Sequence, residues 1–101
     1  MNNIPHLRPY NFLLYQNYPN PFNSSTHIFF QIYKGGDVSL EIYNLNGQLV
    51  KSLINKKHKE GRYDIIWNGS DENGHLVASG IYFCQFKVNG KVRINKLTLI
   101  R

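Results

Sequence analysis

The sequence predicts an all-β domain, an antiparallel sandwich of about seven strands. Apolar residues alternate with polar ones along several short segments, and no segment shows the spacing of an amphipathic helix. Gly, Asn and Asp residues that favour turns separate these segments. Seven Tyr and six Phe stand against a single Met, and aromatic side chains suit the surface of a sheet.

The first half of the chain holds three expected strands. Apolar side chains recur at every second position, as Ile28, Phe30 and Ile32 do, so one face of each strand should be buried. Asn46 and Gly47 favour a tight hairpin after the second strand, because both tolerate the positive φ angles of such turns. The three expected strands are residues 26–33, 38–43 and 48–53.

The second half begins with a polar, basic loop at residues 55–62. Tyr63, Ile65 and Trp67 then mark one face of a strand. The following strand is apolar on both faces, which is typical of a strand central in its sheet. The expected strands are residues 63–67, 81–88 and 91–100, with an Asn-Gly hairpin turn at 89–90 and a short edge segment at 76–77.

The apolar pattern of the last strand changes parity midway. Val92 and Ile94 would face the core at its start, whereas Leu97 and Leu99 would do so farther along. One extra residue between them restores a common face, which predicts a β-bulge near residues 95–96.

Short strands with turn signals between them, in a chain of 101 residues, predict one immunoglobulin-like β-sandwich. We expect it to span residues 14–101 and expect residues 1–13 to be a tail or the remnant of a linker. The chain has no apolar run long enough to cross a bilayer, so no membrane insertion is expected. Its first residues lack the features of a signal peptide, so an exported chain would be a fragment of a longer protein.

The formal charge of +6 raises the question of an acidic partner. Twelve Lys and Arg residues oppose six Asp and Glu residues, but they are spread over several segments. The aromatic residues near them follow strand periodicity, which core packing explains better than base stacking. A basic but ordinary surface is therefore favoured, and no nucleic-acid partner is expected.

No set of residues predicts catalysis. The single cysteine, Cys84, lies in the most apolar strand, where a buried thiol is inert. The four histidines lack metal-ligand spacing, and the acidic residues fall in turns or alternate with core residues. We therefore expect no catalytic residue, no enzymatic activity and no cofactor.

The weak metal candidate is the GSDENG stretch at residues 69–74, where Asp71 and Asn73 resemble the first half of a calcium loop. The distal Glu of such loops is missing. The favoured interpretation is an Asx-type turn, in which both side chains bond nearby backbone amides.

The stretch QNYPNPFN at residues 16–23 is more rigid and more apolar than a connector needs to be. Its prolines favour an extended, polyproline-like segment, and Asn side chains can replace the backbone hydrogen bonds that prolines lack. Two aromatic side chains would then plug the open end of the sandwich. We call residues 18–23 the neck: Tyr18, Pro19, Asn20, Pro21, Phe22 and Asn23.

The stretch LYQNYPNPFNSSTHIFF resembles the opening of type A C-terminal sorting domains of the type IX (Por) secretion system. It is also similar to the related immunoglobulin-like domain of flagellar hook-capping proteins. The resemblance continues through VSLEIYNLNGQLVKSL, EGRYDIIWNGSDENGHLVASGIYFCQF and NGKVRINKLTLIR, in the family's order over residues 14–101. Ser24 departs from a frequent proline, and Asn68 from a frequent Asp after the Trp.

The resemblance implies a tail module rather than a catalyst. Family members cross the inner membrane with a separate signal, and outer-membrane secretion machinery then recognises the folded domain. An upstream cargo in a longer chain would thereby be secreted or reach the cell surface after passage through the periplasm. The matching recognition residues are Gly80, Tyr82, Gly90, Lys91, Lys96, Leu97, Leu99 and Arg101.

Other interpretations stay open at this point. The basic last strand suits recognition by strand addition, but lysines also protect ordinary edge strands. A carbohydrate- or surface-binding module appended to a secreted enzyme would need an exposed aromatic row, for which Tyr33, Tyr43 and Tyr63 are candidates. A flagellar scaffold-like piece is a further alternative.

Overall fold

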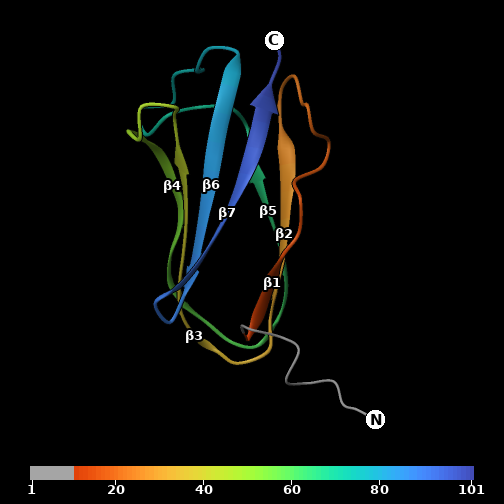
Figure 1. The fold of residues 1–101 in the computed structure, drawn as a ribbon, viewed down its shortest axis with the longest axis vertical. Helices are drawn as coiled ribbons and strands as arrows, with labels where there is room; N and C mark the ends of the chain where they lie inside the picture. Colours follow the sequence, from red (N-terminus) through yellow and green to blue (C-terminus); the bar gives the residue numbers. More distant parts are fainter. Residues whose placement is uncertain (1–10) are drawn as a thin grey trace.

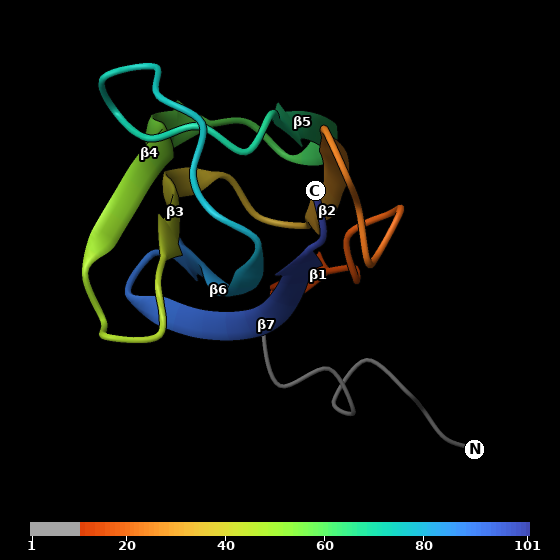
Figure 2. The same ribbon diagram turned by 90° about the horizontal axis from the view of Figure 1, so that it is seen from above.

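The computed structural model describes residues 11–101 and shows seven strands in two antiparallel sheets that pack face to face (Figures 1 and 2). One sheet has the order β1-β2-β5 and the other β4-β3-β6-β7. The predicted all-β sandwich is thereby confirmed. Residues 1–10 of the expected tail lie outside the described residues. The strands are β1 (Phe12–Leu14), β2 (Thr26–Ile32), β3 (Gly36–Tyr43), β4 (Leu49–His58), β5 (Gly61–Trp67), β6 (Gly80–Val88) and β7 (Lys91–Leu99).

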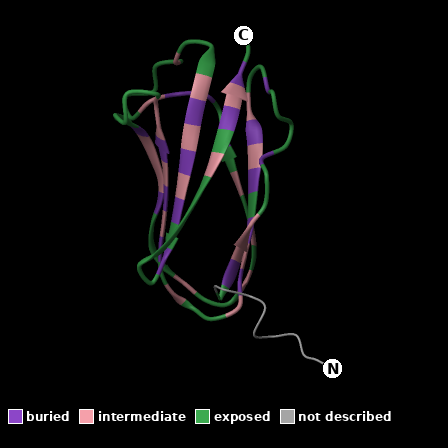
Figure 3. Cartoon of the chain, viewed as in Figure 1, coloured by how far each residue is buried: buried purple, intermediate pink, exposed green. Residues whose placement is uncertain are grey.

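The core lies between the sheets, where the alternating apolar residues of both inner faces meet (Figure 3). At its centre the Phe30 ring lies 4.6 Å from that of Phe86 and 5.1 Å from that of Tyr63, measured between centroids. Trp67 is fully buried near the other end. Each such side chain contributes about 1.5–3 kcal/mol by leaving water, so these rings stabilise the contact between the sheets. No helix suited to crossing a membrane occurs in residues 11–101.

β6 is central in its sheet, as its apolar sequence predicted. It pairs with β3 on one side and with β7 on the other. Its inner positions Tyr82, Cys84, Phe86 and Val88 are buried. Burial raises the pKa of the Cys84 thiol to about 12, because the thiolate would have to leave water.

The predicted loop at residues 55–62 is wrong in extent. β4 continues to His58, and only Lys59 and Glu60 separate it from β5. Residues 55–57 are exposed at a sheet edge, where lysines deter pairing with other chains. An exposed edge strand does not need alternating apolar residues. Residues 55–57 are therefore polar and basic like a loop, although they belong to β4.

The predicted bulge in β7 is also wrong. Pairing with β6 runs without a shift from Gly80 opposite Leu99 to Val88 opposite Lys91. Val92 and Ile94 lie on the outer face, 38% and 57% exposed. Lys91 and Arg93, which alternate with these two residues, are exposed as well. The pattern of apolar residues therefore does not indicate which face of the strand points to the core at this end.

The packed domain begins before residue 14. Phe12 and Leu13, assigned to the tail from the sequence, belong to β1 and pair with β2. Phe12 is buried, and its ring makes an edge contact with Phe86 at 5.2 Å. A strand of three residues is too short to show period-two alternation, which explains the difference.

The burial of Cys84 predicts an unreactive thiol in the folded domain. A thiol-reactive disulfide reagent should leave native protein unlabelled from about pH 7 to 10, and should label one thiol per chain in urea. The folded-state pKa of about 12 exceeds that of an exposed thiol, about 8.5, so unfolding above pH ~8.5 releases a proton. The contribution of Cys84 to stability therefore decreases as pH rises through this window. Native labelling that accelerates in step with thiol ionisation near pH 8.5 would contradict the assignment.

Candidate recognition site at the last strand

β7 is an edge strand, and the neck covers the end of that edge (Figure 1). The Phe22 N–H donates to the Thr98 carbonyl at 3.0 Å, and the Ile100 N–H donates to the Phe22 carbonyl at 2.8 Å. The Asn20 side-chain oxygen accepts the Thr98 N–H at 3.0 Å. The neck thus takes the place of a neighbouring strand at residues 98–100, and the predicted backbone bonding by Asn20 is confirmed.

Two buried polar side chains hold the neck in place. Asn17 Nδ2 donates to Thr26 Oγ1 at 2.9 Å and to the Pro19 carbonyl at 3.2 Å. Thr26 Oγ1 donates to the same carbonyl at 2.8 Å. Both side chains are buried, so each bond also avoids the cost of an unsatisfied polar group.

The neck is not the extended segment that the sequence predicted. The chain bends at residues 19–21, and the peptide bonds before Pro19 and Pro21 are cis. Phe22 alone plugs this end of the core, with its ring centroid 5.7 Å from that of Trp67. Tyr18, expected to share that role, is 73% exposed. The sequence shows that this stretch contains several asparagine and aromatic residues. It does not show which of their side chains the bend directs into the core.

Arg101 joins the end of β7 to the loop before β6. Its guanidinium donates to the carbonyls of Val77 at 2.8 Å and Gly69 at 2.7 Å, and its backbone N–H donates to Ser79 Oγ at 2.8 Å. Gly69 has a φ of +70°, and a Cβ there would lie 2.5 Å from the guanidinium. The positive φ therefore favours glycine at this contact. The guanidinium also donates a long hydrogen bond of 3.5 Å to the Asn23 carbonyl.

The 69–74 stretch forms the predicted Asx-type turn. Asp71 Oδ1 accepts the N–H groups of Asn73 and His75, each at 2.9 Å. These bonds use the Asp71 carboxylate locally. No group of three or more His, Cys, Asp or Glu side chains suited to a metal occurs in residues 11–101. The expected edge segment at 76–77 is reduced to one bridge between Ser70 and Leu76.

The other half of β7 is basic. The Lys96 carbonyl accepts a bond from Gln16 Nε2 at 2.9 Å, which extends the contact beyond the neck. The side chains of Lys91, Arg93 and Lys96 are exposed on this stretch. β7 therefore presents positive charge at the end of its sheet.

The structure divides the predicted recognition residues into two groups. Tyr82, Leu97 and Leu99 are buried, and the Tyr82 hydroxyl donates to the Ala78 carbonyl at 2.6 Å. Their side chains serve the core and are not accessible in the folded domain. The exposed members are Gly80, Gly90, Lys91, Lys96 and Arg101.

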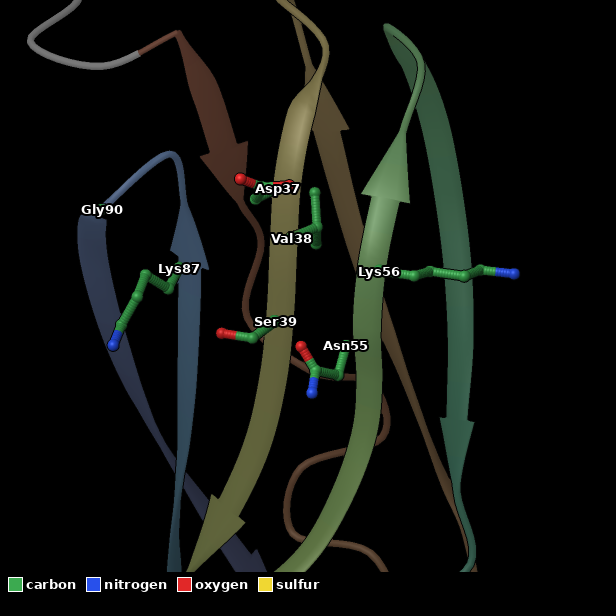
Figure 4. A pocket seen from close by; sticks show the side chains of 7 residues that line it. All are labelled: Asp37, Val38, Ser39, Asn55, Lys56, Lys87 and Gly90. Carbon is green, nitrogen blue, oxygen red and sulfur yellow. The ribbon is translucent and has the colours of Figure 1, made fainter.

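A pocket of about 250 Å³ lies on the outer face of the four-stranded sheet, over β4, β3 and β6 (Figure 4). Ser39, Asn55 and Lys87 come from three adjacent strands, and their side chains point to the same side. Gly90 lines its rim. The pocket therefore presents its hydrogen-bonding groups on the face of the sheet and not at the outer edge of β7.

Tyr33, Tyr43 and Tyr63, the candidates for an exposed aromatic row, do not form one. Tyr63 stacks on Phe30 between the sheets, whereas Tyr43 belongs to the other sheet. Exposed aromatic side chains gather instead around Phe29, on the outer face of the three-stranded sheet. The alternation of residues 28–30 contained this signal, because two buried neighbours place the residue between them outside.

The hydrogen bonds below the neck predict a stability cost for Thr26→Val. Valine keeps the shape of the side chain but removes the hydroxyl that serves Asn17 and Pro19. We expect the free energy of unfolding in urea to fall by about 1–2 kcal/mol. Thr98→Val is the matched control and should cost less than about 0.5 kcal/mol, because Thr98 bonds the neck through its backbone alone. Equal losses in the two variants would show that the buried hydroxyl does not stabilise the neck.

Solved structures share this fold. Latent PorU from Porphyromonas gingivalis is 21% identical with a TM-score of 0.66, and the match covers 88% of this chain and 9% of that one. PorZ, an essential surface component of the type-IX secretion system of the same organism, is 24% identical with a TM-score of 0.58, covering 87% and 11%. FlgD from Xanthomonas campestris, required for hook capping in flagellar assembly, is 24% identical with a TM-score of 0.59, covering 86% and 64%.

These identities establish a common fold and no more. The chain spans about a tenth of PorU and of PorZ and under two thirds of FlgD. No curated protein matches its sequence. A family model does match: the FlgD Ig-like domain, over residues 33–92, which is more than half of the chain. The chain therefore belongs to the FlgD Ig-like domain family.

Proposed function

We propose that this domain is a non-enzymatic type A C-terminal sorting module of the type IX secretion system. In this role outer-membrane secretion machinery binds the folded domain and exports an upstream cargo that belongs to the same, longer chain. The cargo passes through the periplasm and is secreted or reaches the cell surface. The fold shared with PorZ and the sorting-domain motifs over residues 14–101 support this assignment.

The observation that carries the proposal is the basic surface of β7, where the side chains of Lys91, Arg93 and Lys96 are all exposed. β7 is the last strand of the four-stranded sheet, a position at which partner proteins commonly engage a domain. Positive charge on this strand favours a partner segment that carries carboxylates. The neck occupies the other part of β7, because it pairs with residues 98–100.

The proposal of a non-catalytic role rests on the state of the reactive groups. Cys84 is buried, and its pKa of about 12 keeps the thiol protonated at neutral pH. Asp37 pairs with Lys57 at 2.9 Å, and Asp71 bonds its own turn. These carboxylates serve local structure at separate places on the domain.

A secretion reporter tests the role of the β7 edge. Residues 11–101, fused behind a periplasmic reporter in a type IX host, should bring the reporter to the cell surface. The double variant Lys91→Gln, Lys96→Gln removes two positive charges from β7. Because both side chains are exposed, we expect an unchanged fold and a loss of surface display of about tenfold.

The matched control removes two lysines from the opposite edge of the same sheet. Lys56→Gln with Lys57→Gln gives the same net charge, and the exposed Lys57–Asp37 pair contributes little to stability. This variant should display the reporter normally. Equal loss in both double variants would assign the effect to net charge rather than to β7. A wild-type fusion that stays in the periplasm would refute the sorting role itself.

A further inference from the structure

The outer face of the three-stranded sheet carries an exposed aromatic cluster that the sorting role does not use. Phe29 is 41% exposed, Tyr15 48% and Tyr18 73%. Large aromatic side chains gathered on one face are unusual unless the face binds something. β7 belongs to the other sheet and contacts the cluster through the bond that Asn95 Nδ2 donates to the Tyr15 carbonyl at 3.2 Å.

The strand register places polar groups beside these rings. Phe29 lies opposite Asp64, and Gln31 lies opposite Arg62 on the same outer face. On the other side of β2, the Tyr15 N–H donates to the Phe29 carbonyl at 3.0 Å. Tyr15, Phe29 and Arg62 together line a depression of about 370 Å³.

The ring of Phe29 is held in place before any ligand binds. The His27 ring stacks on it at 5.8 Å between centroids, with the two planes 10° apart. His27 Nδ1 in turn lies 3.0 Å from both carboxylate oxygens of Asp64. A side chain fixed in this way loses little conformational freedom on binding.

This combination of groups matches the chemistry of a sugar ring. A pyranose has an apolar face of C–H groups, which packs on an aromatic ring, and a rim of hydroxyls that both donate and accept hydrogen bonds. Arg62 supplies donors, and the Asp64 carboxylate, whose oxygens also lie 3.0 Å from His27 Nδ1, has further lone pairs that can accept from hydroxyls. The two charges are opposite in sign, so the site favours a neutral sugar over an acidic one.

We propose that this face binds a neutral, hexose-containing glycan, with one pyranose ring packed on Phe29 and Tyr15 and its hydroxyls bonded to Arg62 and Asp64. The depression lies at the small end of the range for ligand sites, which suits one or two sugar units. The site is a further function, and substitutions of Lys91 and Lys96 leave the lining of the depression unchanged.

Titration of the ¹⁵N-labelled 101-residue chain with cellohexaose, mannohexaose and maltohexaose tests the proposal. At least one of these neutral oligosaccharides should shift the backbone amide resonances of Tyr15, Phe29 and Arg62. Hexagalacturonate, the acidic probe, should bind more weakly. Phe29→Ala should weaken the binding of the active sugar about tenfold, because the stacking surface is lost.

Ile66→Ala is the matched control on the same face. Ile66 is 55% exposed and apolar, but it offers no ring for a sugar to stack on, so binding should change by less than about twofold. Equal losses in Phe29→Ala and Ile66→Ala would indicate general apolar contact and overturn the proposal. So would resonance shifts on the four-stranded sheet, tighter binding of hexagalacturonate, or no shift with any neutral sugar at about 10 mM.

Discussion

The outer edge of β7 carries backbone N–H and C=O groups that need hydrogen-bonding partners. The neck supplies those partners at residues 98–100, and it keeps its position because Asn17 and Thr26 bond the Pro19 carbonyl from below. The same arrangement inserts Phe22 into the end of the core. One set of hydrogen bonds thus closes this end of the sandwich and pairs the last residues of β7.

The two sheets carry two surfaces with different chemistry. The four-stranded sheet ends in a strand with exposed basic side chains, which suits an acidic partner. The three-stranded sheet presents exposed aromatic side chains instead, with Phe29 stacked on His27 and opposite Asp64 in the strand register. The bond from Asn95 Nδ2 to the Tyr15 carbonyl connects the two surfaces.

Much of the fold could be predicted from local patterns. The strand around Ile28, the hairpin turns at 46–47 and 89–90, and the central place of β6 all follow from alternation and turn chemistry. The prediction failed where a strand lies at an edge. β4 continues through exposed lysines, and Val92 lies outside the core, because an edge position is not required to be apolar.

The sequence by itself determined the fold class, the existence of β2 to β7 and the buried place of Cys84, because these follow from patterns of residues that are close together in the chain. Only the tertiary structure decided that Asn17 rather than Tyr18 turns inward, that the neck pairs with β7 across some eighty residues, and that Tyr15 lies beside Phe29. Each of these depends on how distant segments meet. The hydrogen bonds and ring contacts that fix these features form only when the two sheets pack together.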